Sequence, residues 1–131
     1  TYAEGIYNMA KGTILIPLGD YENALYHLNK VGERGWAKWR KGIIQLMSYN
    51  FDEAKKEMAA LRKQFKESGW KENGGIDYVH AIISAREGDS NAVAENLKTA
   101  LSKDENGMLK ERLVNDVEFI NFSDAVKAAM N

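Results

Sequence analysis

One short stretch of the chain mixes basic and aromatic side chains: Arg34, Trp36, Lys38, Trp39, Arg40 and Lys41. Such a mixture can bind nucleic acid, because cations hold phosphates and aromatic rings stack on bases. At helical spacing, however, the charges and the rings fall on opposite sides. The polar stripe holds Arg34, Lys38, Lys41 and Gln45, and the apolar stripe holds Trp36, Trp39, Ile43 and Met47. We therefore predict core tryptophans beside a solvated basic stripe, and no nucleic-acid partner.

Arg40 differs from the other cations of this stretch because it projects from the middle of the apolar arc. A charge in apolar surroundings needs a partner. One interpretation is a carboxylate on a neighbouring helix. The other is a groove in which Arg40 binds an acidic peptide or a chain terminus.

No group of residues in the sequence points to catalysis or to a metal. The two histidines, His27 and His80, lie on different predicted helices and lack a second ligand at four-residue spacing. The acidic pairs, Asp104-Glu105 and Asp116 with Glu118, fall in a connection and at a helix end, where carboxylates are usually solvated. Cysteine, a glycine-rich phosphate loop and a nucleophile elbow are all absent from the sequence. We expect no enzyme, no cofactor and no metal.

The length and composition of the chain predict one domain, and its charge balance predicts no long-range electrostatic attraction to a partner. A chain of 131 residues with 44% hydrophobic residues can bury a core. Its 18 basic and 19 acidic residues nearly cancel, so no long-range field attracts it to nucleic acid or to an anionic membrane. The longest apolar run, 13–18, is too short to span a bilayer. The chain opens at Thr1 without methionine, which leaves room for a removed leader or a larger parent protein, and no compartment is predicted.

Apolar residues at three- and four-residue spacing predict helices along the chain. Three of these helices begin behind the capping residues Asp20, Asn50 and Asp89, and Gly32 and Gly69 are predicted to end the first two. Local sequence therefore defines both ends of the first two helices.

Each of the three capped helices is preceded by another predicted helix, over 2–17, 35–49 and 76–87. The joints are short and require antiparallel neighbours. Segment 13–16 resembles a strand but runs into the single proline, so we interpret it as the end of a buried helix. Two further helices are predicted over 108–117 and 123–130, which makes about four hairpins.

Three windows of the sequence align with one another: 19–24, 49–54 and 88–93. They resemble the Gly-Asp-Tyr-x-x-Ala turn and second-helix start of tetratricopeptide repeats. Small residues lie seven positions before each turn, at Gly12, Gly42 and Ala81, as in that family. The resemblance implies an all-α, right-handed superhelix of about four antiparallel helix hairpins. It implies a single domain over 1–131, with about three repeats over 5–101 and a capping helix pair over 106–131.

The chain departs from the family in two respects. Its repeats are spaced 30 and 39 residues apart, against about 34 in the family. Positions that hold large apolar residues in the family's first helices hold polar ones here: Asn8, Lys11, Lys38, Lys41, Asp77 and His80. The resemblance therefore supports the hairpins more strongly than the choice of groove residues.

The resemblance implies a scaffold that binds a peptide or helix of a partner protein on its concave face, lined by the first helices. The residues expected there are Met9, Thr13, Trp36, Trp39, Arg40, Ile43, Tyr78 and Ile82. The same positions are compatible with ordinary core packing between helices.

Other interpretations remain open. One is a carbohydrate-binding or envelope-assembly protein that uses exposed Trp36, Trp39 or Trp70 as a sugar platform. Another is an enzyme without a recognised motif. The C-terminal apolar residues either close the stack or mediate self-association: Phe119, Ile120, Phe122, Val126 and Met130.

Overall fold

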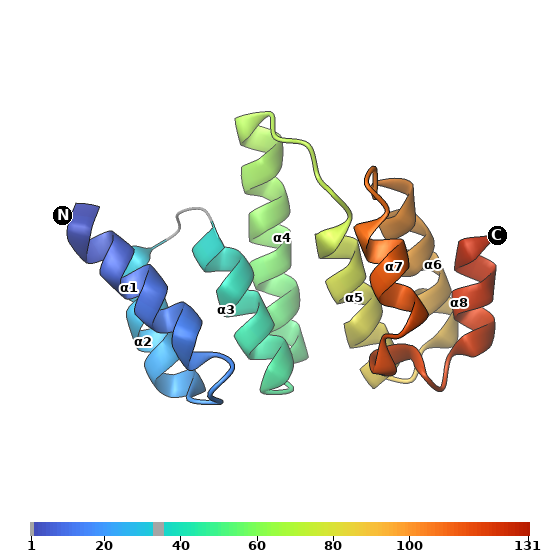
Figure 1. Cartoon of the computed structure of the whole chain (residues 1–131), viewed down its shortest axis with the longest axis horizontal. Helices are drawn as coiled ribbons and strands as arrows, with labels where there is room; N and C mark the ends of the chain where they lie inside the picture. The colour runs from blue at the N-terminus through green and yellow to red at the C-terminus, as the bar shows by residue number, and fades with distance from the viewer. Residues whose placement is uncertain (1, 33–35) are drawn as a thin grey trace. The chain divides into compact units, whose positions relative to one another are not determined.

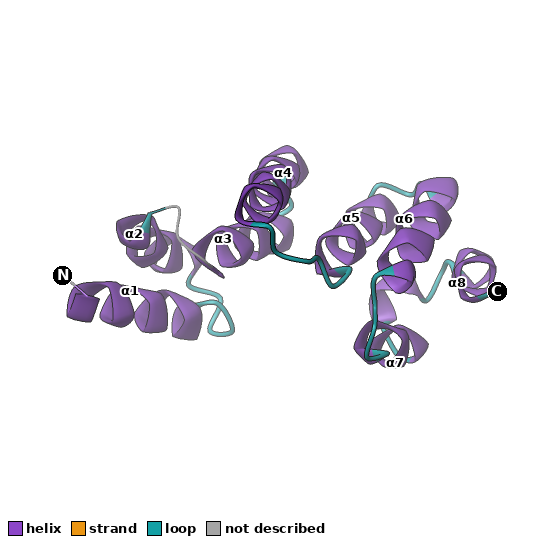
Figure 2. Cartoon of the chain, turned by 90° about the horizontal axis from the view of Figure 1, so that it is seen from above, coloured by secondary structure: helices purple, strands orange, loops and turns teal. Residues whose placement is uncertain are grey.

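The computed structural model describes residues 2–32 and 36–131, and every regular element in this part is helical (Figure 2). Eight α-helices and one short 3-10 helix follow one another. They are α1 (Tyr2–Leu15), α2 (Tyr21–Val31), α3 (Trp36–Met47), α4 (Phe51–Ser68), α5 (Gly75–Arg86), α6 (Ser90–Ser102), α7 (Met108–Val114), η1 (Val117–Phe119) and α8 (Ser123–Met130). The predicted all-α class is confirmed. None of these helices is both long and apolar enough to cross a membrane.

The chain forms two compact units, Thr1–Gln64 and Phe65–Asn131, and the boundary between them falls within α4. The first unit contains α1, α2, α3 and most of α4. The second contains the last turn of α4 and the elements from α5 to α8. Each unit is described by itself below, and the single domain expected over 1–131 stays a prediction.

The helices pair in sequence as antiparallel hairpins: α1 with α2, α3 with α4, and α5 with α6 (Figure 1). The three turns share one backbone geometry. The residue at each turn has a positive φ: 78° at Gly19, 63° at Tyr49 and 78° at Gly88. The next N–H then donates to the carbonyl five residues earlier, at 2.8 to 3.1 Å, which closes the first helix of the pair. Three of the about four predicted hairpins are confirmed, together with their turn positions, whereas α8 packs along α6.

The residue after each turn opens the second helix. Asp20 and Asp89 cap α2 and α6 by accepting the backbone N–H groups of Asn23 and Ala92. Asn50, which was predicted to cap α4, donates its side-chain amide to the Gln45 side chain at 3.0 Å.

Small residues let the paired helices approach closely. A Cβ added at Gly12 would lie 2.7 Å from Leu28 Cγ, and one added at Gly42 would collide with the end of Met58. Ala81, the corresponding residue of α5, is fully buried. Gly12 and Gly42 therefore lie where their helices meet the second helix of the hairpin.

Three predicted helix ends differ by two or three residues in the structure, and one of them is the end of the helix predicted over 35–49, which stops at Met47. The first helix ends at Leu15 instead of residue 17, and Ile14 near its end is exposed, so this end is not buried as predicted. The helix predicted over 108–117 stops at Val114, because Asp116 accepts the N–H of Glu118 and starts η1. In the second unit, η1 contacts α5, and α8 lies along α6 (Figure 1).

Candidate functional site

Six of the predicted site residues lie on α1 and α3 of the first unit, and one contact between these helices joins two of them. The two helices meet where Arg40 Nη1 donates to the Met9 sulfur at 3.8 Å. The remaining members lie within one helical turn of these two residues. We call this set the first-unit face: Met9, Thr13, Trp36, Trp39, Arg40 and Ile43.

The first-unit face combines an exposed ring with side chains that are packed beneath it. Trp36 is 53% exposed, so the expected placement of this ring in the core is wrong. It is the first residue of α3. Met9 packs against a buried cluster of Ala24, Leu28 and Ile44, so this member of the face contacts the hydrophobic core.

Arg40 is the charged member of the first-unit face. It is half-buried, and among the residues that the structure describes no acidic side chain forms an ion pair with it. The sulfur of Met9 is only a weak acceptor for a guanidinium. The first interpretation drawn from the sequence was a carboxylate partner on a neighbouring helix, and the described residues show no such partner for Arg40. A cation with so weak an acceptor can gain from an anion that arrives with a ligand.

Two polar side chains of α1 and α3, Thr13 and Lys41, contact backbone carbonyl oxygens. The Thr13 hydroxyl donates to the Met9 carbonyl at 2.7 Å. Lys41 is only 6% exposed, and its Nζ lies 3.4 Å from the Gly32 carbonyl oxygen. The expected solvated stripe is therefore wrong at Lys41, because its long methylene chain is buried while its amine reaches a backbone oxygen at the end of α2.

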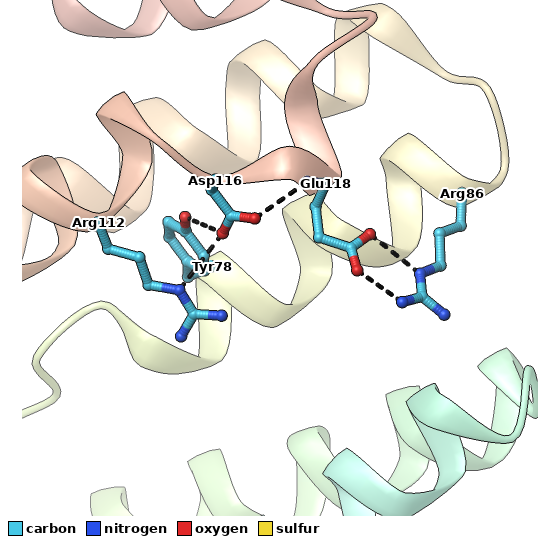
Figure 3. Close-up of polar contacts among 5 residues, drawn as sticks. All are labelled: Tyr78, Arg86, Arg112, Asp116 and Glu118. Carbon is cyan, nitrogen blue, oxygen red and sulfur yellow. Dashed lines mark hydrogen bonds and ion pairs between the residues drawn. The ribbon is translucent and has the colours of Figure 1, made fainter.

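The other two predicted site residues, Tyr78 and Ile82, lie on α5 in the second unit and are buried. Tyr78 is 2% exposed, and its ring packs edge-to-face against Phe119, with centroids 5.6 Å apart. The hydroxyl of Tyr78 donates to Asp116 Oδ2 at 2.6 Å (Figure 3). Segment 116–119 of the chain itself therefore covers this side chain.

The Asp116 carboxylate, at the start of η1, accepts hydrogen bonds from three donors. Besides the Tyr78 hydroxyl, it accepts Arg112 Nε at 3.3 Å and the backbone N–H of Glu118 at 3.0 Å (Figure 3). Burial raises the pKa of Tyr78 well above its ordinary value, and the hydrogen bond to Asp116 adds to this shift. The phenol therefore stays protonated and keeps donating over the physiological pH range.

Glu118 and Arg86 form a second link between η1 and α5. Arg86 donates from Nε and Nη2 to the two oxygens of Glu118, at 3.1 and 2.6 Å (Figure 3). Both side chains are about three quarters buried, with exposed fractions of 23% and 26%. The prediction that Asp116 and Glu118 are solvated is wrong, because their partners lie on α5, more than 30 residues earlier in the chain.

His27 has a partner that the sequence did not predict. Asn8 donates its amide nitrogen to the Glu4 carbonyl at 2.9 Å, so its Oδ1 is the atom that faces His27 Nδ1, at 2.9 Å. His27 Nδ1 therefore carries a proton. The rings of Tyr7 and Tyr26 lie edge-on to the imidazole. No three acidic, histidine or cysteine side chains gather as a metal site in residues 2–32 and 36–131.

Comparisons with protein-family models, with curated proteins and with solved structures find no match to this chain. The function of the candidate site is therefore inferred from its geometry.

Proposed function

We propose that this protein is a non-catalytic binding module whose first-unit face holds a peptide or a helix of a partner protein. The observation that carries the proposal is the combination of exposed Trp36 with half-buried Arg40, whose guanidinium contacts a sulfur and no described carboxylate. Aromatic rings and arginines contribute most of the binding energy at protein interfaces. A surface that carries both on packed helices loses little conformational entropy when a ligand binds.

The arrangement of the hairpins that we propose is a right-handed superhelix of the tetratricopeptide type. Three turns with the same φ sign and hydrogen bonds support this arrangement, as do close-packed small residues in the first helices. In such a superhelix the first helices line the inner surface, which is where α1 and α3 would present the first-unit face.

Site-specific photo-crosslinking tests the proposed function. A photoreactive phenylalanine at position 36 should capture a partner that is identified by mass spectrometry, and Arg40→Gln should reduce its yield at least about fivefold. The matched control is the same photoreactive residue at Trp70, which is 57% exposed and lies in the second unit. Equal capture at both positions, or capture at position 36 that is insensitive to Arg40, would contradict the proposal.

A carbohydrate-binding protein is the second candidate, because two tryptophans, Trp36 and Trp70, are more than half exposed. Sugars stack their apolar faces on such rings. Binding to a glycan array that is abolished by Trp36→Ala or Trp70→Ala would favour this candidate over a protein partner.

A further inference from the structure

We infer that copies of this chain associate head to tail, so that an apolar ridge on α1 of one copy docks on an apolar patch beside η1 of the next copy. This inference goes beyond the proposed function, because its partner is a second copy of the chain. Neither of the two surfaces contains a residue of the first-unit face.

The α1 ridge is a row of apolar side chains at four-residue spacing: Ile6, Ala10, Ile14 and Leu18. The first three belong to the helix, where this spacing forms a continuous ridge, and Leu18 follows in the turn. Ile6, Ile14 and Leu18 are each more than half exposed. The contact of α1 with α2 lies at Gly12, on a different side of the helix. The second helix of the hairpin therefore leaves the α1 ridge uncovered.

The η1 patch is a set of three exposed apolar side chains at three-residue spacing: Val114, Val117 and Ile120. A 3-10 helix has three residues per turn, so Val117 and Ile120 lie on one side of η1. Glu118 and Phe119 occupy the other two sides and contact α5. This attachment leaves Val117 and Ile120 facing solvent, where each is about three quarters exposed. A partner that covers them gains from the burial of apolar surface.

The net charges of the two units are opposite in sign and select how these surfaces pair. Residues 1–64 contain ten basic and seven acidic side chains, whereas residues 65–131 contain eight basic and twelve acidic ones. The α1 ridge lies in the basic unit and the η1 patch in the acidic unit. A contact of ridge with ridge, or of patch with patch, brings like charges together, whereas a contact of ridge with patch joins opposite charges. A second copy of the chain therefore supplies a complementary surface for each.

One charged side chain beside each surface supports this pairing. Lys11 lies three residues before Ile14 on α1, and Glu111 has the same position relative to Val114 on α7. Residues three apart on a helix are neighbours, so each charge borders its surface. Lys11 and Glu111 are exposed, and neither forms an ion pair with a residue that the structure describes. We assign the ion pair at the edge of the contact to Lys11 of one copy and Glu111 of the next.

The size and the symmetry of this contact determine the expected assembly. The two surfaces are small, and interfaces at the lower end of the size range are weak, so the dissociation constant should be micromolar. Each copy that has docked its ridge still has a free patch. A contact between two different surfaces therefore adds further copies to the end of the assembly instead of stopping at a dimer.

Sedimentation velocity of the full chain over a range of protein concentrations tests the inference. The wild type should form species larger than a dimer as the concentration rises. Two double variants each block one surface with uncharged side chains, which keeps the charge of both units. They are Ile6→Gln with Ile14→Gln for the ridge, and Val117→Gln with Ile120→Gln for the patch. Each double variant should be monomeric by itself, because every copy lacks the same half of the contact.

An equimolar mixture of the two double variants gives the decisive result. The variant with the altered ridge retains an intact patch, and the variant with the altered patch retains an intact ridge. The mixture should therefore form a dimer with one copy of each variant and nothing larger. A symmetric contact does not give this result, because it requires the same surface on both copies.

Two sets of control variants accompany the mixture. Met47→Gln with Met130→Gln replaces one exposed apolar side chain in each unit, outside both surfaces, and should associate like the wild type. Lys11→Glu and Glu111→Lys should each weaken the association about fivefold, and a chain with both changes should return to within about twofold of the wild-type affinity. These changes at exposed charged residues test the pairing independently of the glutamine substitutions. Far-ultraviolet circular dichroism checks that every variant is folded.

Three results would overturn the inference. A wild type that remains monomeric at every concentration excludes self-association. Double variants that associate like the wild type show that other surfaces form the contact. A mixture of the two double variants that remains monomeric excludes the pairing of ridge with patch. The proposed function is tested separately in each case, because the first-unit face is unchanged in all of these variants.

Discussion

Replacing Gly12 by alanine should destabilise the protein, although alanine is the better helix former. A Cβ at this position would lie 2.7 and 2.9 Å from two carbons of Leu28 and 3.1 Å from the Ala24 carbonyl oxygen. Carbon atoms prefer separations of about 3.5 to 4.0 Å. Leu28 is fully buried, and a backbone oxygen cannot rotate away, so the two helices must move apart.

The magnitude follows from two opposing contributions. Alanine in place of glycine within a helix contributes up to about 1 kcal/mol of stability. Overpacking a tight contact costs about 1 to 3 kcal/mol, and the backbone contact places Gly12 near the upper end. The expected net change is a loss of about 1 to 2 kcal/mol in the free energy of unfolding.

Gly5 supplies a matched control on the same helix, because a Cβ there would meet nothing within 4 Å. Gly5→Ala should therefore stabilise the protein by about 0.5 to 1 kcal/mol. Gly42→Ala is an intermediate case, since the new Cβ meets the flexible end of Met58, which can change rotamer. The expected order of stability is Gly5→Ala, then Gly42→Ala, then Gly12→Ala.

Urea unfolding followed by far-ultraviolet circular dichroism measures this order. With a slope of about 1 to 3 kcal/mol per molar urea, the Gly5 and Gly12 variants should differ in midpoint by about 1 M. If Gly12→Ala is as stable as Gly5→Ala, the close approach of α1 and α2 is not tight in solution. The packing argument for the three small residues would then be refuted.

Three further predictions concern single side chains. Tyr78→Phe should lower the free energy of unfolding by about 1 to 3 kcal/mol, because Asp116 loses a buried donor. Because the pKa of Tyr78 is raised in the folded protein, the protonated phenol stabilises the fold fully below the ordinary tyrosine pKa of about 10, and this contribution declines as the pH rises above it. Urea titrations at about pH 8 and about pH 11 should show this decline in the wild type and less of it in Tyr78→Phe. Asp89→Ala should cost about 1 kcal/mol by removing the cap of α6, measured by the same titration, and a change below about 0.3 kcal/mol would contradict the capping role. In a Trp70→Phe variant, acrylamide should still quench part of the emission, because Trp36 remains half exposed; full protection would contradict the structure of the first-unit face.

The helices and turns could be predicted because their causes are local. At Gly19 and Gly88 the chain needs a positive φ, and the residue that follows caps the next helix. Tyr49 adopts the same conformation without glycine, and there the Asn50 N–H donates to the Gln45 carbonyl as in the other two turns. This turn could therefore be predicted from the sequence even though Tyr49 replaces the glycine of the pattern.

The candidate site could be predicted only in part. Periodicity placed Trp36, Arg40 and Ile43 on one side of a helix, and this follows from helical geometry alone. Periodicity did not indicate that Trp36 is exposed or that Lys41 is buried. These two outcomes depend on which neighbours cover each side of α3, and a pattern along one helix does not contain that information.

The sequence by itself determined the all-α class, the order of the helices and the close-packed small residues, because caps, turns and helical periods act within a few residues. Only the tertiary structure decided the environments of Arg40 on α3 and of Arg86 and Tyr78 on α5. Arg86 and Tyr78 of α5 meet carboxylates that lie 32 and 38 residues later in the chain, whereas Arg40 of α3 meets a methionine sulfur from α1. Such contacts join residues that local propensity treats as independent, and they exist only once the helices have packed.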